Sequence, residues 1–259
     1  MDGLCLGDNL VVMSGMASCS VELIYADPPF GANRSRRGAL GEFNDSWPRP
    51  ADYIAWLRPR VQEMHRLLAP LGTLYLHLDR RNVHHGRLLL DEVFGEARFG
   101  NEIIWHYTGG GRSGRYFPHK HDNILVYHRG SEYTFNADAV REPYAQTSGY
   151  ARSGIVSAAG KLYRPHPLGK VMDDVWRVPI VNPLSPERTG YPTQKPVELL
   201  RRIVAASSDC GDVVLDPFCG SGTTPVVAES LGRRWIAIDE SPAAIETARA
   251  RLERLRAGR

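Results

Sequence analysis

The chain has 259 residues, 42% of them hydrophobic, which is enough to bury the core of one large domain. Lys and Arg number 32 against 29 Asp and Glu, so the mildly basic charge is compatible with a nucleic-acid partner without requiring one. No apolar run approaches the roughly 20 residues of a membrane span, no secretion signal opens the chain, and the 4 cysteines lack zinc-finger spacing. We therefore expect a reduced, cytoplasmic protein with no membrane anchor and no metal site.

Strand and helix patterns then alternate along the chain. Up to residue 130 they predict strands at 21–26, 72–79, 101–108 and 123–130 and helices at 51–70 and 81–94, with a polar loop at 31–50. After residue 190 they predict helices at 196–207 and 222–231, strands at 212–216 and 234–239, and a C-terminal helix. This alternation predicts a layered α/β domain.

Residues 131–190 interrupt the alternation. They are rich in Pro, Gly, Ser and Tyr and show weak periodicity. We interpret them as an insertion between an α/β part at 1–130 and a second part at 191–259.

The stretch LIYADPPFGAN at 23–33 places an acid, two prolines and an aromatic residue directly after a strand. Because Pro28 and Pro29 cannot continue a sheet ladder, the strand must end at Asp27. The Asp27 carboxylate and the Phe30 ring should therefore lie together at one edge of the sheet, as a site requires.

A second signal lies in DVVLDPFCGSGTT, at 212–224. A strand ends at Asp216, Gly220 and Gly222 would let the backbone approach a ligand, and a helix begins near Thr223 with its amides facing the loop. A following strand ends in Asp239, where an acid can bind ribose hydroxyls. The loop lacks the third glycine of a dinucleotide motif and the lysine of a P-loop, and a tight turn alone would also need glycine.

Three motifs occur in a fixed order: DPPF at 27–30, TQKP at 193–196 and DPFCGSGTT at 216–224. In this order they resemble the β group of DNA amino-methyltransferases, which use S-adenosylmethionine to methylate adenine N6 or cytosine N4. In that group the catalytic motif precedes the cofactor motif, a circular permutation, whereas RNA guanine amino-methyltransferases normally have the opposite order. The resemblance implies a three-layer α/β, Rossmann-like methyltransferase fold with a mixed, mostly parallel sheet.

The resemblance also assigns roles to the three parts of the chain. It implies a catalytic half at 1–130, a target-recognition insertion at 131–190 and a cofactor-binding half at 191–259. The implied contacts with S-adenosylmethionine are an adenine acceptor, a ribose acceptor and a methionine pocket, formed by Asp8, Asp239, Thr193, Lys195, Asp216, Phe218, Gly220, Gly222 and Thr223. Lys195 could instead be an ordinary lysine at the start of a helix.

The DPPF motif suits an amino group that is a poor nucleophile. Asp27 and the Pro28 carbonyl can accept its hydrogen bonds and return electron density to the nitrogen. Pro29 acts as a rigid spacer, and Phe30 can stack on a base that has been rotated out of the duplex. The alternative is purely structural: a strand-end cap, a loop stop and a core ring.

Basic residues on loops suit the phosphate backbone of double-stranded DNA. Two loops carry them, one just after the catalytic motif and one that is Gly-rich: Arg34, Arg36, Arg37, Arg112, Arg115 and Lys120. We expect the first three to hold phosphates beside the displaced base and residues 131–190 to choose the sequence. A solvated loop face is the alternative for both loops.

Adenine is the favoured target because Asp27 precedes the prolines, where related cytosine enzymes more often have Ser. Cytosine N4 remains the alternative. A non-catalytic cofactor-binding module should lack Asp27 or the glycine loop, and an endonuclease should show clustered metal-binding acids, of which the sequence gives no convincing set. The resemblance further suggests a homodimer and a cognate restriction endonuclease.

Overall fold

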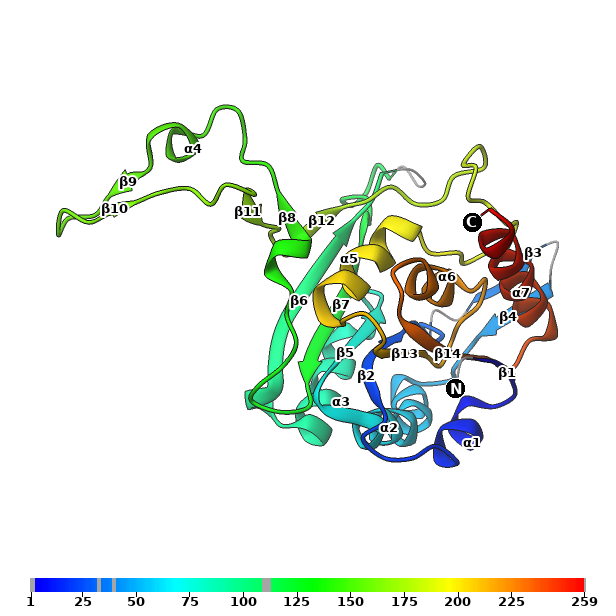
Figure 1. Ribbon diagram of the computed structural model, residues 1–259. Coiled ribbons are helices and arrows are strands. Elements are labelled where there is room, and N and C mark those ends of the chain that lie inside the picture. Colours follow the sequence, from blue (N-terminus) through cyan, green and yellow to red (C-terminus); the bar gives the residue numbers. More distant parts are fainter. Residues whose placement is uncertain (1–2, 32–33, 39–40, 109–112, 259) are drawn as a thin grey trace.

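The computed structural model describes residues 3–31, 34–38, 41–108 and 113–258; the side chains of 34–38 and 41–44 lie outside this description. Across the described residues, eight strands form one sheet in the order β1-β14-β13-β2-β5-β7-β6-β12 (Figure 1). Their bounds are β1 Gly3–Leu6, β2 Val21–Ala26, β5 Leu68–Leu78, β6 Phe99–His106, β7 His121–His128, β12 Val175–Arg177, β13 Val213–Asp216 and β14 Arg234–Asp239. Only β7 runs against the others, so the predicted mixed, mostly parallel sheet is confirmed.

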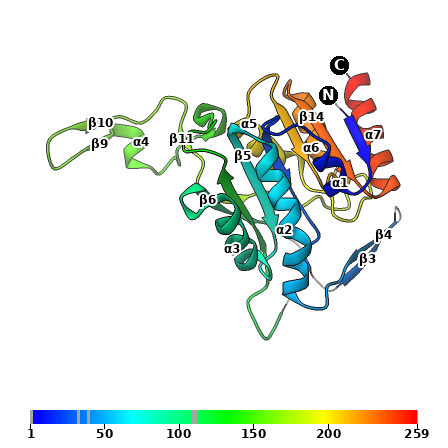
Figure 2. The same cartoon turned by 90° about the horizontal axis from the view of Figure 1, so that it is seen from below.

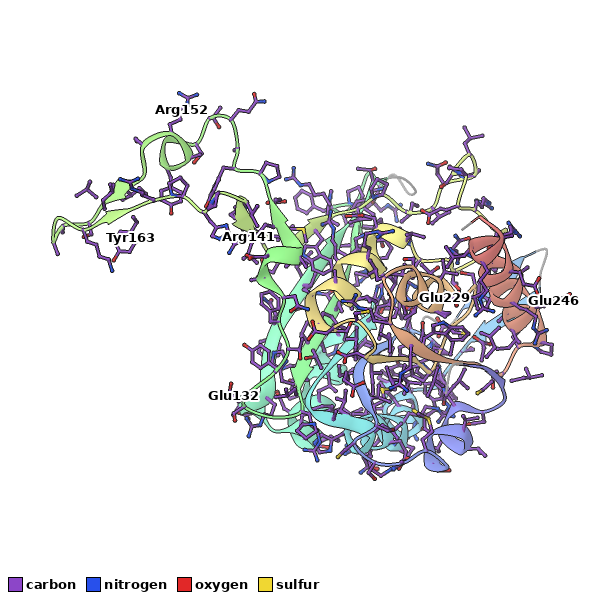
Figure 3. The ribbon with its side chains drawn as sticks, viewed as in Figure 1. Glu132, Arg141, Arg152, Tyr163, Glu229 and Glu246 are labelled. Carbon is purple, nitrogen blue, oxygen red and sulfur yellow. The ribbon has the colours of Figure 1, made fainter. Side chains whose placement is uncertain are left out.

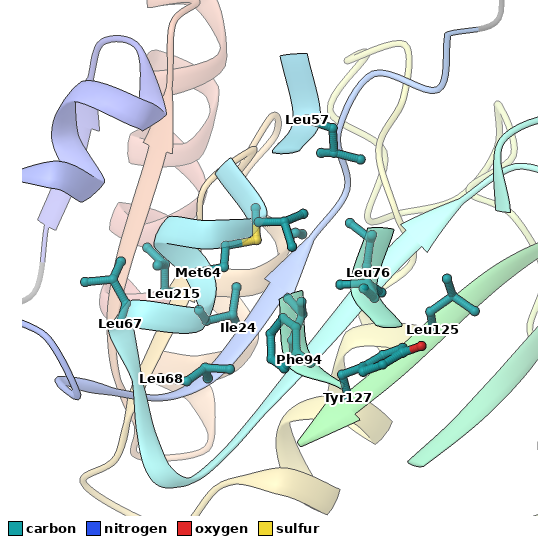
Figure 4. Packing of buried hydrophobic residues seen from close by; sticks show 14 of the residues in the cluster. Ile24, Leu57, Met64, Leu67, Leu68, Leu76, Phe94, Leu125, Tyr127 and Leu215 are labelled. Carbon is teal, nitrogen blue, oxygen red and sulfur yellow. The ribbon is translucent and has the colours of Figure 1, made fainter. Parts of the chain in front are cut away.

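Helices cover both faces of this sheet and make three layers (Figure 2). One face carries α1 Asn9–Ser14, α2 Pro50–Leu67 and α3 Val83–Phe94; the other carries α5 Val197–Ser207, α6 Thr223–Ser230 and α7 Pro242–Ala257. A hydrophobic core lies on each face of the sheet, and strand β2 contributes side chains to both because side chains alternate along a strand. Ile24 packs with Met64 and Leu215 on the first face (Figure 4), whereas Leu23 and Tyr25 pack on the second.

The helices begin where the sequence gives start signals. Pro50 and Pro242 occupy the first turns of α2 and α7, where a missing amide hydrogen is harmless. Ser241 caps α7 by accepting a hydrogen bond from the Ala244 amide, and Asp8 caps α1 in the same way. Pro59 lies inside α2, as expected. No helix in the described part of the chain is long and apolar enough to cross a lipid bilayer.

The expectation of a polar loop at 31–50 is wrong in part. Strands β3 Arg34–Gly38 and β4 Gly41–Asp45 pair antiparallel, with Arg34 opposite Asp45. The hairpin stands apart from the main sheet, so no alternation of apolar residues was needed to form it. This is why the hydrophobic pattern gave no strand here.

Residues 131–190 contain a projecting arm, defined here as residues 141–171. At its base β8 Arg141–Glu142 pairs with β11 Lys170–Val171, and further out lie α4 Gly149–Ser153, β9 Ile155–Val156 and β10 Leu162–Tyr163. Figure 3 shows Arg152 and Tyr163 on this arm, well away from the sheet. The chain then returns, and β12 adds an edge strand beside β6 that buries Trp176. The segment therefore also supplies part of the core.

Candidate functional site

Five neighbouring parallel strands, β1, β14, β13, β2 and β5, end at the same edge of the sheet, where ligands bind in open α/β folds. A cavity of about 840 Å³ lies at this edge. It is lined by nearly all the residues that the sequence predicts for catalysis and cofactor binding: Asp8, Asp27, Pro28, Pro29, Phe30, Thr193, Lys195, Asp216, Phe218, Gly220, Thr223 and Asp239. The two separate motifs therefore share one site.

Asp27 follows the last residue of β2, as the proline pair predicts. Its Oδ2 atom pairs with the ammonium of Lys195, and the two side chains are only 14% and 13% exposed. The same ammonium lies 5.3 Å from the centre of the Phe30 ring. The sequence suggested that Lys195 completes the methionine pocket; the structure places its charge on the proposed catalytic acid.

Two side chains hold the turn after the prolines. The Asn82 amide donates a hydrogen bond of 2.6 Å to the Phe30 carbonyl, and the Gly31 amide donates one of 2.6 Å to Oδ1 of Asp45. Gly31 has a φ of 65°, which favours glycine. Sequence reasoning missed Asn82 and Asp45, because neither belongs to a motif and their partners lie 52 and 14 residues away in the chain.

A buried polar cluster lies behind Asp27. His77, at the end of β5, is fully buried, and its Nδ1 atom lies 2.8 Å from the Tyr25 hydroxyl and 3.8 Å from Oδ1 of Asp27. Its Nε2 atom lies 3.5 Å from Oδ2 of Asp122, an ion-pair distance rather than a short hydrogen bond. Burial opposes the shift, but the neighbouring His77 imidazole nevertheless lowers the pKa of the Asp122 carboxyl. Sequence reasoning missed this cluster; a His at the end of a buried strand was its only signal.

The glycine loop is held at both ends by carboxylates. Asp216 is buried and accepts hydrogen bonds from the Phe218 amide, at 3.0 Å, and from the Thr224 hydroxyl. Burial raises the pKa of Asp216 to about 7. At the other end, the Gly220 amide donates to Oδ2 of Asp239 at 2.8 Å, and burial raises the pKa of that carboxyl as well. These contacts fix the loop before any ligand arrives.

Gly222 is the one predicted cofactor-binding residue that is not among those lining the cavity. Its φ is 75°, and a Cβ atom added to it would lie 2.5 Å from the Cβ of Ala248 in α7. The absent side chain therefore lets α7 pack closely against the loop. From the same helix, Arg251 donates to the Ser221 carbonyl at 3.0 Å and to the Thr223 hydroxyl at 2.8 Å, a contact that no sequence motif announced.

The far end of the cavity combines an acid with aromatic rings. Asp8 accepts from the Leu10 amide at 2.7 Å and pairs with Arg60 at 3.0 Å. The Arg60 guanidinium lies 4.0 Å from the centre of the Trp56 ring, and that ring lies 6.0 Å from Phe218. Such a wall suits a planar heterocycle with an amino substituent.

Comparison with known proteins shows which family the chain belongs to. Residues 21–250 match the family model N6_N4_Mtase, described as DNA methylase. The chain belongs to this DNA methylase family. Its resemblance to the DNA amino-methyltransferases is thereby confirmed.

Relatives of this DNA methylase match along most of their length. DNA adenine methyltransferase YhdJ of Escherichia coli is 32% identical over 235 residues, which is 90% of this chain and 76% of the relative. Type II methyltransferase M.HpaI of Haemophilus parainfluenzae is 31% identical over 258 residues, or 98% and 75% of the two chains.

Solved structures share the fold at lower identity. The M1.HpyAVI–SAM complex has a TM-score of 0.65 and 20% identity, covering 97% of this chain and 99% of that one. PvuII DNA methyltransferase, described as cytosine-N4-specific, has a TM-score of 0.68 and 16% identity, covering 99% and 91%. These likenesses confirm the predicted methyltransferase fold.

The residues predicted to bind DNA are only partly described in this DNA methylase. The Arg34, Arg36 and Arg37 side chains and all of Arg112 lie outside the described residues. Arg115 is exposed and Lys120 is half-buried on the segment that leads into β7, and neither lines the cavity. Tyr116 and His119 of the same segment do line it, with their rings stacked 5.2 Å apart.

Proposed function

We propose that this DNA methylase transfers a methyl group from S-adenosylmethionine to the N6 amino group of adenine within a specific sequence of double-stranded DNA. The observation that carries the proposal is the position of Asp27. Its carboxylate lines the same cavity as the glycine loop and the two acids, Asp8 and Asp239, that suit a nucleoside.

The residues of the cavity fit the proposed cofactor. Asp8, Trp56 and Phe218 suit an adenine ring and its amino group, and Asp239 suits ribose hydroxyls. The start of α6, at Thr223, adds helix amides near the loop that would meet the methionine end. When bound there, S-adenosylmethionine supplies an electrophilic methyl group.

The chain's own groups prepare the amino nitrogen for attack. Oδ2 of Asp27 pairs with Lys195, while Oδ1 has no hydrogen-bond partner within the described structure. That free oxygen and the Pro28 carbonyl can accept the two amino hydrogens, which returns the nitrogen lone pair from the ring. Because Asn82 holds the Phe30 carbonyl, the stacking ring stays beside this acceptor pair.

Adenine is favoured over cytosine by two observations. A carboxylate stands before the prolines at Asp27, and the 32% identical relative YhdJ is named a DNA adenine methyltransferase. Cytosine N4 is the second candidate, since the cytosine-N4-specific PvuII enzyme has the same fold with a TM-score of 0.68.

Nucleoside analysis tests the proposal. Wild-type protein would be incubated with methyl-labelled S-adenosylmethionine and unmethylated DNA of mixed sequence, and the product digested to nucleosides. We expect N6-methyladenine, a loss of about a hundredfold in Asp27→Asn, and intact cofactor binding by that variant in calorimetry. Glu246→Gln, which neutralises an exposed acid on α7, is the matched control. If the product is methylcytosine, cytosine N4 takes the place of adenine N6 as the target. If no methylated base is found, the proposal is overturned.

The arm is proposed to choose the sequence that is methylated. Residues 143–172 contain no Asp or Glu but carry Arg152, Lys161 and Arg164. The arm also exposes the apolar side chains of Ile155 and Val156. Cations contact phosphates and exposed apolar groups contact base edges in a groove, which supports this assignment.

Mapping of methylated sites by sequencing tests the assignment. Replacing Ile155 and Val156, the exposed apolar side chains proposed to contact base edges, by Ser should change which sites are methylated. Replacing the arginines at 34, 36 and 37 should instead weaken binding to every sequence and flatten its dependence on salt. The reverse pattern would exchange the two roles. We further propose that the protein is a cytoplasmic homodimer that is paired with a restriction endonuclease. The type II names of relatives such as M.HpaI support the pairing with an endonuclease.

A further inference from the structure

The imidazole of His77 lies between two carboxylates in the interior of the protein. It is fully buried, with Asp27 on its Nδ1 side and Asp122 on its Nε2 side. The rings of Phe30 and Trp105 also contact it, each 5.5 Å away between ring centres. Burying ionisable groups is costly unless they compensate one another, so packing alone does not account for this arrangement.

Tyr25 and Asp122 together indicate the resting tautomer of His77, because the Asp122 carboxylate can only accept a hydrogen bond whereas the Tyr25 hydroxyl can donate one. Burial raises the pKa of Tyr25 far above its usual range, so the phenol keeps its proton and can donate it to Nδ1, 2.8 Å away. The ring proton of a neutral imidazole then sits on Nε2, directed toward Asp122. Nδ1, which also faces Asp27, is then the unprotonated nitrogen, and it can take up a proton when the Tyr25 hydroxyl turns its hydrogen away.

Charge balance shows when that nitrogen would be used. With His77 neutral, Asp27, Asp122 and Lys195 leave the cluster with one net negative charge. Methyl transfer to an amino group places a positive charge on the nitrogen, which must then lose a proton. A proton moved onto His77 makes the cluster neutral, so the buried carboxylates favour this step.

We propose that His77 receives the proton that the methylated amino nitrogen loses, through the Asp27 carboxylate. This inference rests on the proposed function. The N–C bond forms as the S–C bond of the donor breaks, with that bond's electron pair left on sulfur. One proton passes from nitrogen to Oδ1 of Asp27 and, once the Tyr25 hydroxyl has turned its hydrogen away, on to Nδ1 of His77, which lies 3.8 Å from Oδ1 at rest. His77 thus acts through Asp27 and restores its carboxylate.

The route continues to the cavity through Asp122. This side chain is 15% exposed, lines the cavity, and accepts a hydrogen bond of 3.3 Å from the Tyr107 hydroxyl. The imidazolium can release its Nε2 proton to Asp122 and thereby to water. The groups that face His77 come from β2 (Tyr25), from the residue after it (Asp27), from β7 (Asp122) and from the segment before α5 (Lys195).

The first test needs no cofactor or DNA. Histidines labelled at Cε1 would be titrated by NMR, with His77→Gln used to assign the resonance. Asp122→Asn removes a carboxylate that favours the imidazolium, so the titration midpoint of His77 should fall by about one pH unit. An unchanged midpoint would show that the two groups are not coupled and would overturn the relay.

The second test is the pH dependence of single-turnover methylation. Wild type should lose rate as pH falls through the His77 midpoint, since the protonated imidazole cannot accept. His77→Gln should be about tenfold slower and should not show this loss of rate at low pH, the acid limb of the profile. In Asp122→Asn the acid limb should move to lower pH together with the NMR midpoint. His84→Gln, an exposed histidine on α3, is the matched control and should match wild type.

The outcomes separate the two proposals. Normal wild-type methylation with an unchanged acid limb in His77→Gln would overturn the relay alone. If His77→Gln fails to fold, the His77 resonance would be assigned by elimination with single His→Gln variants of the other histidines. An acid limb in Asp122→Asn that stays in place while this NMR midpoint moves would then overturn the relay equally. An absence of DNA methylation by the wild type, with the NMR coupling intact, would instead overturn the proposed function, and the relay with it.

Discussion

Asp216 should make the protein less stable as pH rises from about 4 to 7. Its side chain is buried at the end of β13, where it accepts hydrogen bonds from the Phe218 amide and the Thr224 hydroxyl. Burial raises its pKa from 3.8 to about 7. The perturbation that isolates this group is Asp216→Asn, because an amide has the same shape, can still accept from Phe218 and cannot ionise.

The sign follows from the protons bound in each state. Between about pH 4 and 7 the folded protein holds a proton on Asp216 that the unfolded chain has released. Stability therefore falls with rising pH across this window and is independent of this group below and above it. Each pH unit is worth about 1.4 kcal/mol, so the window is worth on the order of 4 kcal/mol.

Urea unfolding at pH 4 and pH 8 measures the effect. The free energy of unfolding should fall between these pH values by on the order of 4 kcal/mol more in wild type than in Asp216→Asn. Glu246→Gln, at an exposed acid, should follow the wild-type curve. Parallel curves for wild type and Asp216→Asn would show that the carboxyl is already ionised in the folded protein at pH 4, which would refute the reasoning.

Two further predictions concern the glycine loop and the ion pair. Gly222→Ala should lower the free energy of unfolding by about 2–4 kcal/mol, because of left-handed backbone strain and a clash with α7. Gly211→Ala is the control: its φ is 89°, and apart from its chain neighbours no described atom lies within 4 Å of the added Cβ. It should lose only the strain energy, about 1–2 kcal/mol. Urea unfolding measures both variants, and equal losses of unfolding free energy would show that the clash with α7 contributes nothing. Lys195→Met should cost about 3 kcal/mol because it leaves the Asp27 carboxylate buried without its cation, whereas Lys170→Met, at a side chain that is 36% exposed, should cost less than about 1 kcal/mol. Similar unfolding midpoints for these two variants would contradict the importance of burial.

The order of strands and helices could be predicted because it depends on the local pattern of apolar and polar residues. β2 alternates its side chains between two cores, and the Pro28–Pro29 pair ends it where expected. The placement of Asp27 and Asp239 at one edge followed, since parallel strands end on the same side. The β3–β4 hairpin and the strand β12 were missed, because a hairpin outside the main sheet and a three-residue edge strand carry little hydrophobic periodicity.

The residues around the two motifs could not be predicted in the same way. His77 and Asp122 meet only because β5 and β7 are neighbours in the sheet, and Gly222 meets Ala248 only because α7 packs beside α6. Such contacts depend on strand order and helix packing, which no single stretch of sequence specifies. The sequence alone does not show whether a glycine is needed for the approach of a ligand or for the packing of a helix.

The contact of Lys195 joins the two motifs that the sequence presents separately. Its ammonium pairs with Asp27, which lies 168 residues earlier in the chain, while its carbonyl accepts a hydrogen bond of 3.0 Å from the Thr223 hydroxyl at the start of α6. One residue thus links the proposed catalytic acid to the glycine loop. Because Arg251 fixes that same hydroxyl at 2.8 Å, the position of Asp27 depends in turn on α7. A change in the loop should therefore alter the acid as well as cofactor binding, which makes the two halves of the chain a single site.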